Sequence, residues 1–515
     1  MSNPAGQPPL AIAHEVTVRI GHHLVLAPAS FELQPGECTV VTGPNGSGKS
    51  ILAEIIAGVR TPSTGTMSWP GLCDDPDARA ALVSFEMQER LIARERHEDM
   101  SAIMHGELDP GHTVAELIGE DSVGGGADAV LPLAERFGIS HILSRGLRFL
   151  STGEFRKALL AAALVRDPRL LLLDDPYDGL DAASRDELAR LIDDLHSAER
   201  SLLLVVNRAR DIPSCATRVI ELRDGAVHRD EAMRPRADPS VRRADPSVRR
   251  ADPSVRRAER PPREAASAPN TDATLHRPGR RCPPQEAIVS MRDVRVSYGP
   301  VAVLNAVDWT VCPNDRWMIV GPNGSGKSTL LSLITGDNPK GYGQEISLFG
   351  RRKGSGESVW EIKRRIGYVS GDLQFAYPLH ATVRETLLSG FHDSVGLFDE
   401  PSGHEEEIAK EWAGRLGLAD RLNTRLRELS FGLRRVVLVA RAVVKTPRLL
   451  IADEPCQGLD DEHTAQVLEL LEAIGAGETT LLYVTHDPAE QLRGLTHRLE
   501  LTPGPEGSRA VTTAL

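Results

Sequence analysis

GPNGSGKS occupies Gly43–Ser50, and the same eight residues recur at Gly321–Ser328. Each copy follows a β-rich run and opens a stretch with helical spacing, so its glycines can turn successive N–H groups toward phosphate oxygens. Lys49 and Lys327 are expected to bridge the β- and γ-phosphates of a nucleotide. We therefore predict two ATP sites, whose phosphates contact Gly43, Pro44, Asn45, Gly46, Ser47, Gly48, Lys49 and Ser50 in the first and Gly321, Pro322, Asn323, Gly324, Ser325, Gly326, Lys327, Ser328 and Thr329 in the second.

A second motif repeats at nearly the same distance. LLLLDDPYDGLD at Leu170–Asp181 reappears as LLIADEPCQGLD at Leu449–Asp460, 279 residues later, whereas the two glycine-rich copies are 278 residues apart. Chance matches would not keep this register, so the chain contains a duplicated domain. We place the first copy in residues 1–231 and the second in residues 286–515.

Residues 232–285 have a different composition. The heptad ADPSVRR occurs three times between Ala237 and Arg257, with one proline and few apolar residues in each unit. Such a segment cannot bury enough apolar surface to offset its ordering entropy, so we predict a disordered linker. It has 13 arginines against 6 acidic residues, but a solvated tether is favoured over a nucleic-acid-binding arm.

The overall composition is that of a globular protein, 41 % hydrophobic and 26 % charged. The formal net charge of −12 gives no general attraction to nucleic acid, which makes a nucleic-acid partner an unfavoured interpretation. No apolar run approaches the roughly 18 residues of a membrane span, and the N-terminal residues do not resemble a signal peptide. Six scattered cysteines without a C-x-x-C pair predict reduced thiols, with neither a zinc site nor a disulfide framework.

Strand and helix signals alternate within each copy. The β-rich run Cys38–Thr42 stops at the first glycine-rich loop, and Ser50–Val59 then has helical spacing. Leu170–Leu173, Leu202–Val206 and Leu481–Val484 are continuous apolar runs, as expected of strands that are buried on both faces. This is an α/β pattern with a central parallel sheet.

Acidic residues stand directly after two of the apolar strands. Asp174 and Asp453 are expected to hold the water shell of Mg²⁺, which Ser50 and Ser328 would also ligate. The next residue would polarise the attacking water, and it is Glu454 in the second copy but Asp175 in the first. Asp is one methylene shorter, and moving such a group by about 1 Å can lower a rate roughly a hundredfold.

A third motif indicates the family. LSTGE at Leu150–Glu154 and LSFGL at Leu429–Leu433 each place a serine, Ser151 or Ser430, 23 residues before the acidic Asp. They resemble the LSGGQ signature of ATP-binding-cassette proteins. The resemblance implies two P-loop cassettes in tandem, each with a helical subdomain, that pair head to tail. In that pairing the signature, here with Ser151 and Gly153 or Ser430 and Gly432, caps the γ-phosphate held by the other cassette.

The same resemblance identifies further site positions. The family's histidine, downstream of the catalytic acid, corresponds to His486 in the second copy and to Asn207 in the first, and its adenine-stacking aromatic corresponds to Tyr298 and to Ile20. Asn can hydrogen-bond but cannot become charged. His22 or His23 could replace the missing aromatic. The glutamine of the family's Q-loop has the candidates Gln374 beside Gly371 in the second copy, and Glu86 and Gln88 in the first.

The departures from the family pattern, Asp175, Asn207 and Ile20, all fall on one of the two ATP sites that the crossed pairing would form. Site one combines the first phosphate loop, Asp174, Asp175 and Asn207 with the second signature. Site two combines the second phosphate loop, Asp453, Glu454 and His486 with the first signature. We therefore expect Glu454 and His486 to hydrolyse ATP at site two, and Asp175 to support only slow turnover at site one.

Longer stretches resemble the ModF proteins, which are described as molybdate-transport ATP-binding proteins and as photorepair proteins. These stretches are LSTGEFRKALL, DDPYDGLDAASR and the run from Gly321 to Ser370; the repeat linker and Leu433 depart from the family pattern. The resemblance implies an ATPase that docks on a separate membrane-spanning permease, in the cytoplasm or peripherally on the cytoplasmic face of the inner membrane. Its cofactors would be ATP and Mg²⁺.

Two other functional classes stay open. A tandem cassette of the ABC-F type acting on ribosomes would carry a long helical arm between the cassettes, which the prolines of the linker exclude. A DNA-repair ATPase of the known cassette types would carry zinc cysteines or a coiled-coil insertion, and neither is present. Transport is the favoured interpretation.

Overall fold

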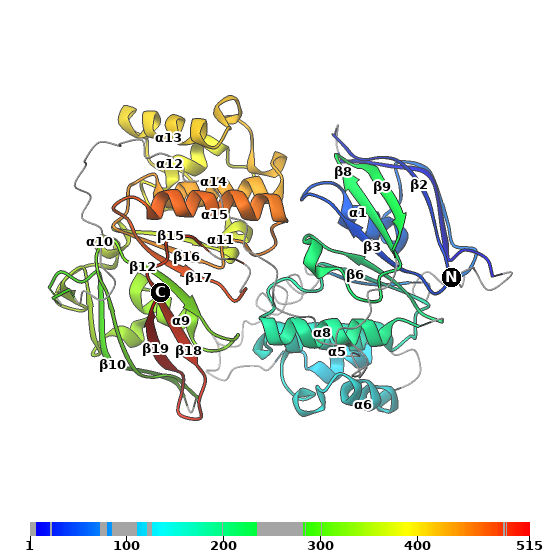
Figure 1. Cartoon of the computed structure of the whole chain (residues 1–515), viewed down its shortest axis with the longest axis horizontal. Helices are drawn as coiled ribbons and strands as arrows, with labels where there is room; N and C mark the ends of the chain where they lie inside the picture. The colour runs from blue at the N-terminus through cyan, green and yellow to red at the C-terminus, as the bar shows by residue number, and fades with distance from the viewer. Residues whose placement is uncertain are drawn as a thin grey trace, which may run out of the picture.

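The computed structural model describes residues 7–20, 23–72, 80–84, 111–120, 126–197, 199–233, 282–283, 285–299, 301–487, 490 and 492–515. These residues form two halves of similar architecture, one built from β1 (Ala11–Ile20) to β9 (Ala226–Ala232) and the other from β10 (Val289–Tyr298) to β19 (Arg509–Ala514). The halves lie side by side with their helical parts at opposite ends, so they are arranged head to tail (Figure 1). The expected linker falls almost wholly outside the described residues.

A six-stranded sheet forms the centre of the first half. Its order is β5-β6-β7-β3-β8-β9, with only β9 antiparallel to its neighbour. Residue after residue of β6 and β7 is buried, which explains why these strands are continuous apolar runs rather than alternating ones. The remaining strands of this sheet are β3 (Cys38–Thr42), β5 (Ala81–Ser84), β6 (Leu170–Asp174), β7 (Ser201–Val205) and β8 (Arg218–Arg223).

The second half repeats this sheet. Its order is β15-β16-β17-β12-β18-β19, and again only the last strand is antiparallel. Both sheets therefore place the strand before the phosphate loop beside the strand that precedes the family's histidine position. The strands are β12 (Arg316–Val320), β15 (Ile366–Ser370), β16 (Leu449–Asp453), β17 (Thr480–Val484) and β18 (His497–Thr502).

An antiparallel sheet packs over the phosphate-loop helix of each half. In the first half it consists of β1, β2 (His23–Leu33) and β4 (Thr64–Ser68), and its apolar face meets α1 (Lys49–Ile56) in one buried cluster. In the second half it consists of β10, β11 (Val301–Val311), β13 (Glu345–Leu348) and β14 (Arg351–Arg352), which cover α9 (Lys327–Thr335).

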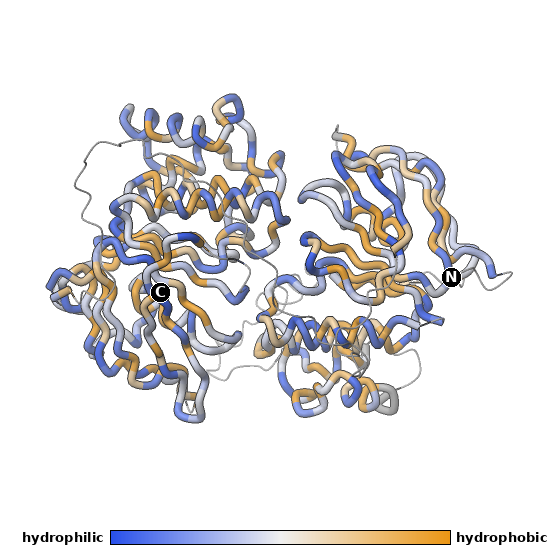
Figure 2. The backbone as a smooth tube through the Cα atoms, viewed as in Figure 1, coloured by the Kyte–Doolittle hydropathy of each residue, from blue (hydrophilic) through white to orange (hydrophobic). Residues whose placement is uncertain are grey.

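A helical subdomain covers the other face of each six-stranded sheet. Its helices and the sheet share one apolar cluster in each half, and Figure 2 shows apolar residues gathered inside both halves. The helices of the first half are α5 (Val114–Glu120), α6 (Gly126–Arg136), α7 (Thr152–Leu164) and α8 (Ala182–Leu195). Those of the second are α11 (Gly371–Ala376), α12 (Val383–Ser389), α13 (Gly403–Arg415), α14 (Phe431–Val443) and α15 (Asp461–Gly475). The short helix α10 (Val359–Lys363) lies on the opposite face and packs with α9.

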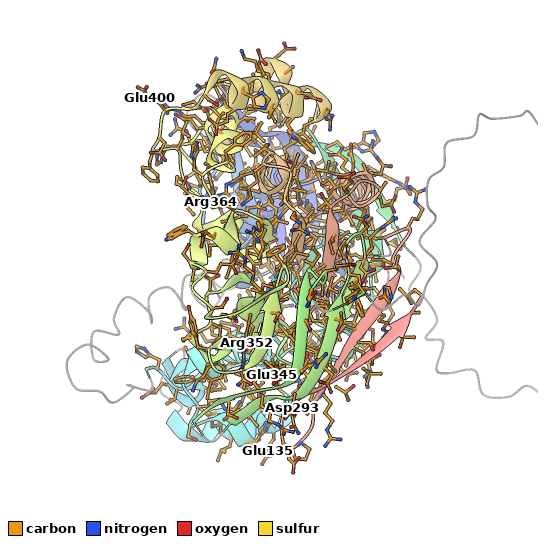
Figure 3. All side chains as sticks on the ribbon, turned by 90° about the vertical axis from the view of Figure 1, so that its left-hand side faces the viewer. Glu135, Asp293, Glu345, Arg352, Arg364 and Glu400 are labelled. Atoms are coloured by element: carbon orange, nitrogen blue, oxygen red, sulfur yellow. A yellow bond between two sulfur atoms is a disulfide. The ribbon has the colours of Figure 1, made fainter. Side chains whose placement is uncertain are left out.

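Short 3-10 turns complete the description at Ser140–Ile142, Leu147–Phe149, Ala209–Asp211, Pro339–Gly341, Ala419–Arg421 and Leu426–Glu428. Charged residues such as Glu345, Arg364 and Glu400 are exposed, and the side view in Figure 3 labels them. Within the described part of the chain, no helix is both long and apolar enough to cross a membrane.

The prediction that all cysteines are reduced is wrong for one pair. Cys282 and Cys312 form a disulfide, with 5.8 Å between their Cα atoms. Cys312 follows β11, and the pairing of β11 with β10 brings it beside the segment that leads into β10. This proximity depends on strand register, and a separation of 30 residues in the sequence does not reveal it.

Candidate functional site

Each phosphate loop joins a central strand to a helix. The residue before the lysine is a glycine in the left-handed region, Gly48 with φ 94° and Gly326 with φ 89°, which a side chain would disfavour. Lys49 Nζ donates to the carbonyl oxygens of Gly43 and Pro44 at 2.8 and 3.0 Å. Lys327 repeats these bonds within its own loop. Both lysines are thus held at the mouth of the loop, and burial lowers the pKa of each despite nearby carboxylates.

The acidic pairs lie at the carboxyl ends of β6 and β16. Asp175 and Glu454 both have positive φ angles, 49° and 48°. Their backbone amides donate to the equivalent carbonyls of the neighbouring strand, Val205 O at 3.1 Å and Val484 O at 3.0 Å. A non-glycine residue in this region is strained, and such strain is concentrated at functional sites. The backbone therefore aims both acids in the same way.

The residue opposite each acid differs between the halves. Asn207 Nδ2 donates to Asp175 Oδ2 at 2.7 Å, whereas His486 Nδ1 lies 3.1 Å from Glu454 Oε1 as an ion pair. Burial opposes ionisation of both partners of that pair, but their mutual contact outweighs it, so the pKa of His486 is raised and that of Glu454 is lowered. Burial, followed by the charge of Asp174, raises the pKa of Asp175 well above its usual value. Both members of the second pair can ionise, whereas Asn207 of the first pair cannot.

The signature serines begin helices. Ser151 is the N-cap of α7 and forms a capping box with Glu154. Ser430 is the N-cap of α14, where its hydroxyl accepts a bond from the Leu433 amide at 3.2 Å, but Leu433 has no carboxylate to close a box. Each signature therefore presents the positive end of a helix dipole.

Two cavities combine groups from both halves. The first, site one, is lined by Lys49, Ser50, Asp174, Asp175 and Asn207 from one half and by Ser430, Phe431 and Arg434 from the other. The second, site two, is lined by Lys327, Ser328, Asp453 and Glu454 together with Ser151 and Glu154. A methyl group added to Gly46 would lie 3.5 Å from the Ser430 side chain, which shows how closely loop and signature approach. The arrangement is crossed.

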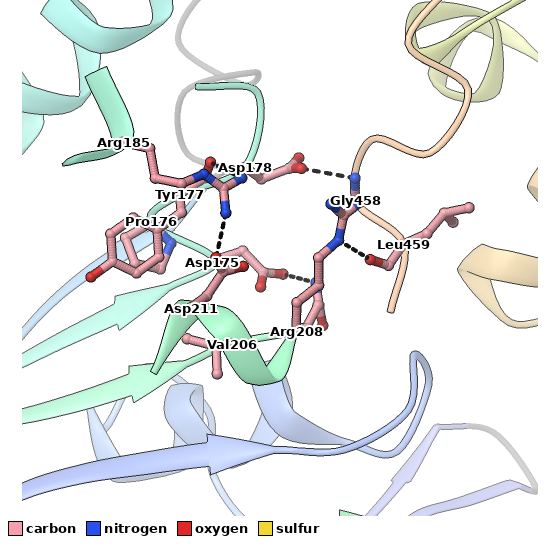
Figure 4. Close-up of a pocket in the computed structure, with 11 residues that line it drawn as sticks. Asp175, Pro176, Tyr177, Asp178, Arg185, Val206, Arg208, Asp211, Gly458 and Leu459 are labelled. Atoms are coloured by element: carbon pink, nitrogen blue, oxygen red, sulfur yellow. Dashed lines mark hydrogen bonds and ion pairs between the residues drawn. The ribbon is translucent and has the colours of Figure 1, made fainter. Parts of the chain in front are cut away.

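Three aspartates outside the expected site positions connect the halves. Asp460 Oδ2 accepts from the Asn45 amide at 2.5 Å, and Asp181 Oδ2 accepts from the Asn323 amide at 3.1 Å. Asp178 Oδ1 also accepts from the amide of Gly458 at 2.8 Å (Figure 4). The matching positions of Asp181 and Asp460 in the repeated motif were the only signal in the sequence.

Of the remaining expected positions, some line the two sites, one is buried elsewhere, and some lie outside the described residues. Tyr298 and Ile20 line site two and site one respectively, and the Tyr298 hydroxyl accepts from Asn338 at 2.8 Å. Gly371 also lines site two, but Gln374 is buried and donates to the Phe431 carbonyl at 2.9 Å. Glu86, Gln88 and His22 lie outside the described residues, as does the side chain of His23.

The donor sets suit Mg²⁺ in both sites. Mg²⁺ prefers hard oxygen ligands and is commonly bound by one or two carboxylates together with phosphate oxygens. Ser50 shares its cavity with Asp174, and Ser328 shares its cavity with Asp453. When bound, the ion would neutralise charge on the nucleotide's phosphates.

Two phosphate-loop folds, each completed by the signature of the other, define a tandem ATP-binding-cassette ATPase that binds ATP. The family model described as "ABC transporter" matches residues 26–178 and again residues 304–457. The chain belongs to the ABC transporter family.

Similarity to known proteins extends over both cassettes. The chain is 37 % identical to the ABC transporter ATP-binding protein ModF of Escherichia coli, over 95 % of this chain and 96 % of the relative. An uncharacterised ABC transporter ATP-binding protein of Schizosaccharomyces pombe is 28 % identical, over 89 % of this chain and 90 % of its own length. The HMP/thiamine import ATP-binding protein YkoD of Bacillus subtilis is 25 % identical over 89 % of this chain and 83 % of its own length.

Solved structures share the fold of the whole chain. A model of ribosome-bound archaeal Pelota and ABCE1 contains a chain with a TM-score of 0.58 at 19 % identity, covering 98 % of this chain and 78 % of that one. The complex of archaeal ribosomal stalk protein aP1 with the ribosome recycling factor aABCE1 gives 0.53, also at 19 % identity, covering 97 % of this chain and 90 % of that one. At this identity the likeness concerns the tandem fold alone.

Proposed function

We propose that the protein binds ATP with Mg²⁺ at both crossed sites and hydrolyses it mainly at site two. The observation that carries the proposal is the contrast between the pair Glu454–His486 and the pair Asp175–Asn207. In both sites the acid is aimed by the same strained backbone, so the difference lies in the side chains.

Glu454 is the residue we propose to orient and polarise the attacking water at site two. His486 would hold that carboxylate in place, Lys327 would contact the β- and γ-phosphates, and the helix that begins at Ser151 would stabilise negative charge developing on the γ-phosphate. Tyr298 would stack on the base. At site one Asp175 is shorter by one methylene, and Asn207 supplies a hydrogen bond but no charge.

Matched substitutions at the two acids test this proposal. Glu454→Gln should remove most steady-state ATP hydrolysis while ATP binding is preserved, because Gln keeps the shape of Glu but loses its charge. Asp175→Asn, the same chemical change at site one, should lower the rate much less. Equal losses in the two variants would overturn the asymmetry.

We further propose that this ATPase energises transport through a separate membrane-spanning permease at the cytoplasmic face of a membrane. The names of the relatives support this role: ModF is an ABC transporter ATP-binding protein, and YkoD is named for HMP/thiamine import. Molybdate or a similar oxyanion would be the cargo by resemblance to ModF. The cargo would bind to the permease, so no oxyanion pocket is required in the cassettes.

Co-purification tests the partner. The full chain carrying Glu454→Gln, trapped with ATP, should be recovered from detergent-solubilised membranes with a polytopic membrane subunit. Lys327→Ala, which weakens ATP binding at site two, serves as the matched control and should recover less. Recovery of ribosomes instead, with no membrane subunit, would contradict transport and favour a role in translation.

A further inference from the structure

Arg208 of the first half reaches across the interface into the second half. Its guanidinium donates to the carbonyl oxygens of Cys456 at 2.6 Å and Leu459 at 3.0 Å, and it pairs with the carboxylates of Asp487 at 2.9 Å and Glu490 at 3.0 Å. Only 8 % of the residue is exposed. Figure 4 shows this side chain extending from its own strand end toward Leu459 of the other half. A planar guanidinium can satisfy all four acceptors at once, which an ammonium group cannot.

The position of Asp487 makes this contact unusual. Asp487 lies 279 residues after Arg208, which is the offset between the two cassettes. Arg208 follows Asn207, and Asp487 follows His486. The two residues are therefore structural equivalents that meet each other at the centre of the interface, with opposite charges. Arg210 adds a second, two-bond contact to the same carboxylate.

The opposite charges of Arg208 and Asp487 favour pairing of the first cassette with the second. If two copies of the first cassette met in this geometry, Arg208 would face Arg208, and the carboxylate nearest to it would be Asp211, the equivalent of Glu490. If two copies of the second cassette met, Asp487 would face Asp487. Like charges brought together in a buried interface are destabilising and suppress the wrong pairing. Only one cassette of each kind places Arg208 opposite Asp487.

The same contacts hold a loop that both sites share. The segment that Arg208 contacts, residues 456–459, follows Glu454 of site two. It precedes Asp460, whose carboxylate accepts from the Asn45 amide of site one. Every partner in the set is a protein group, so no contact needs a nucleotide to bridge it. The set is able to keep the cassettes together throughout a cycle of ATP binding and release.

We propose that Arg208 and Asp487 form a charge lock, which pairs the first cassette with the second and holds the two together whether or not nucleotide is bound. The proposal concerns how the cassettes pair and does not depend on which site hydrolyses ATP.

Small-angle X-ray scattering of the full chain in nucleotide-free buffer tests whether the lock holds. The wild type should keep one compact envelope. Arg208→Met and Arg208→Glu should increase the radius of gyration, with the larger shift for Glu, and Arg208→Lys should give the smallest shift. Arg223→Met is the matched control, since Arg223 is an exposed residue of the same cassette that pairs only locally with Glu221. Scattering by Arg208→Glu that equals scattering by the control would overturn the lock.

A second variant guards against misfolding. Asp487→Asn keeps the size of the side chain and leaves Arg208 paired with Glu490, so its radius should fall between those of the wild type and Arg208→Glu. Circular dichroism should show wild-type helix content in every variant. A compact Asp487→Asn chain would count against the proposal even if Arg208→Glu failed to fold.

Mixing two charge-reversed chains tests partner selection. Arg208→Asp places aspartate at both equivalent positions of one chain, and Asp487→Arg places arginine at both positions of the other. Neither chain can form the lock internally, but a mixture restores the native Arg208–Asp487 pair between chains. Light scattering should detect a species of twice the monomer mass in the mixture and not in either chain alone. A mixture that remains monomeric would contradict selection by charge.

Discussion

Asp175 and Glu454 hold the same place in their cassettes, and their backbones are the same within a degree of φ. Their side chains differ by one methylene, and the partner changes from Asn207 to His486. The rate depends steeply on the distance between the carboxylate and the water that it positions, so a side chain that is one methylene shorter should lower the rate strongly. The functional difference that we propose between the two sites therefore rests on two side chains and not on the fold around them.

Restoring these two side chains should therefore restore site one. In a Glu454→Gln background, which silences site two, Asp175→Glu combined with Asn207→His should raise residual ATP hydrolysis by roughly tenfold to a hundredfold. Asn207→His alone is the control and should change the rate little, because the shorter Asp175 remains. Steady-state phosphate release measures all three chains. No gain in the triple variant would mean that Phe431 or another group limits site one.

Residues with local roles could be predicted from the sequence, and residues with roles across the interface could not. The phosphate loops are recognisable because eight consecutive residues define them. Arg208 carries no motif, and its partners are more than 240 residues away, so only the pairing of the cassettes reveals it. Gln374 was a candidate at its site from spacing alone, but the first turn of α11 buries its side chain against Phe431.

At the scale of elements, each signature helix contributes to the ATP site of the cassette to which it does not belong. The helix that begins at Ser151 belongs to the first cassette but opens onto the phosphate loop of the second, and α14 does the reverse. Crossed geometry of this kind means that a change in one cassette alters the chemistry of the other.

Because the sites are crossed, a substitution in the first cassette should impair hydrolysis at the site that holds the phosphate loop of the second. Ser151→Arg should remove most ATP hydrolysis, because the bulky cation enters site two, although the change is in the first cassette. Ser430→Arg should lower the rate far less. Both changes remove the N-cap of a helix, at a similar cost of about 1 kcal/mol, so the comparison is matched for stability. Greater damage from Ser430→Arg would contradict the crossed assignment.

A histidine on α15 distinguishes the elements behind the two signatures. His463 Nδ1 contacts Asp460 at 2.8 Å, and its ring packs directly against Gly432. The hydrogen bond to Asp460 raises the pKa of His463, against the opposing effect of burial. The equivalent residue behind the first signature is Ser184, which is also bonded to the N-cap aspartate of its helix.

The sign of this pKa shift predicts how stability depends on pH. A raised pKa means that folding favours the protonated ring, so its contribution is fully present below the unfolded pKa of about 6.5 and is lost as pH rises through the folded pKa. The difference in melting temperature between the wild type and His463→Ser should therefore be largest in weakly acidic buffer and shrink toward alkaline pH. A difference that grows with pH would show that the ring acts in its neutral form.

At the scale of the whole molecule, two unequal cassettes share one interface. The sequence predicted the tandem α/β fold from the repeat, because motif spacing survives duplication. It did not predict the Cys282–Cys312 disulfide, which depends on the register of β10 and β11. Nor could it predict the contact between Arg208 and Asp487, because these equivalent positions meet only when the two cassettes face each other.

The content of bound nucleotide after one turnover tests the central claim, that the crossed sites are unequal, most directly. The full chain is loaded with excess radiolabelled ATP and Mg²⁺, separated rapidly from free nucleotide, and the bound ATP and ADP are counted per chain. We predict one retained ATP, held at site one, for each ADP formed at site two, and Asp175→Asn should leave this ratio unchanged. Conversion of both bound nucleotides to ADP at the same rate would contradict the account.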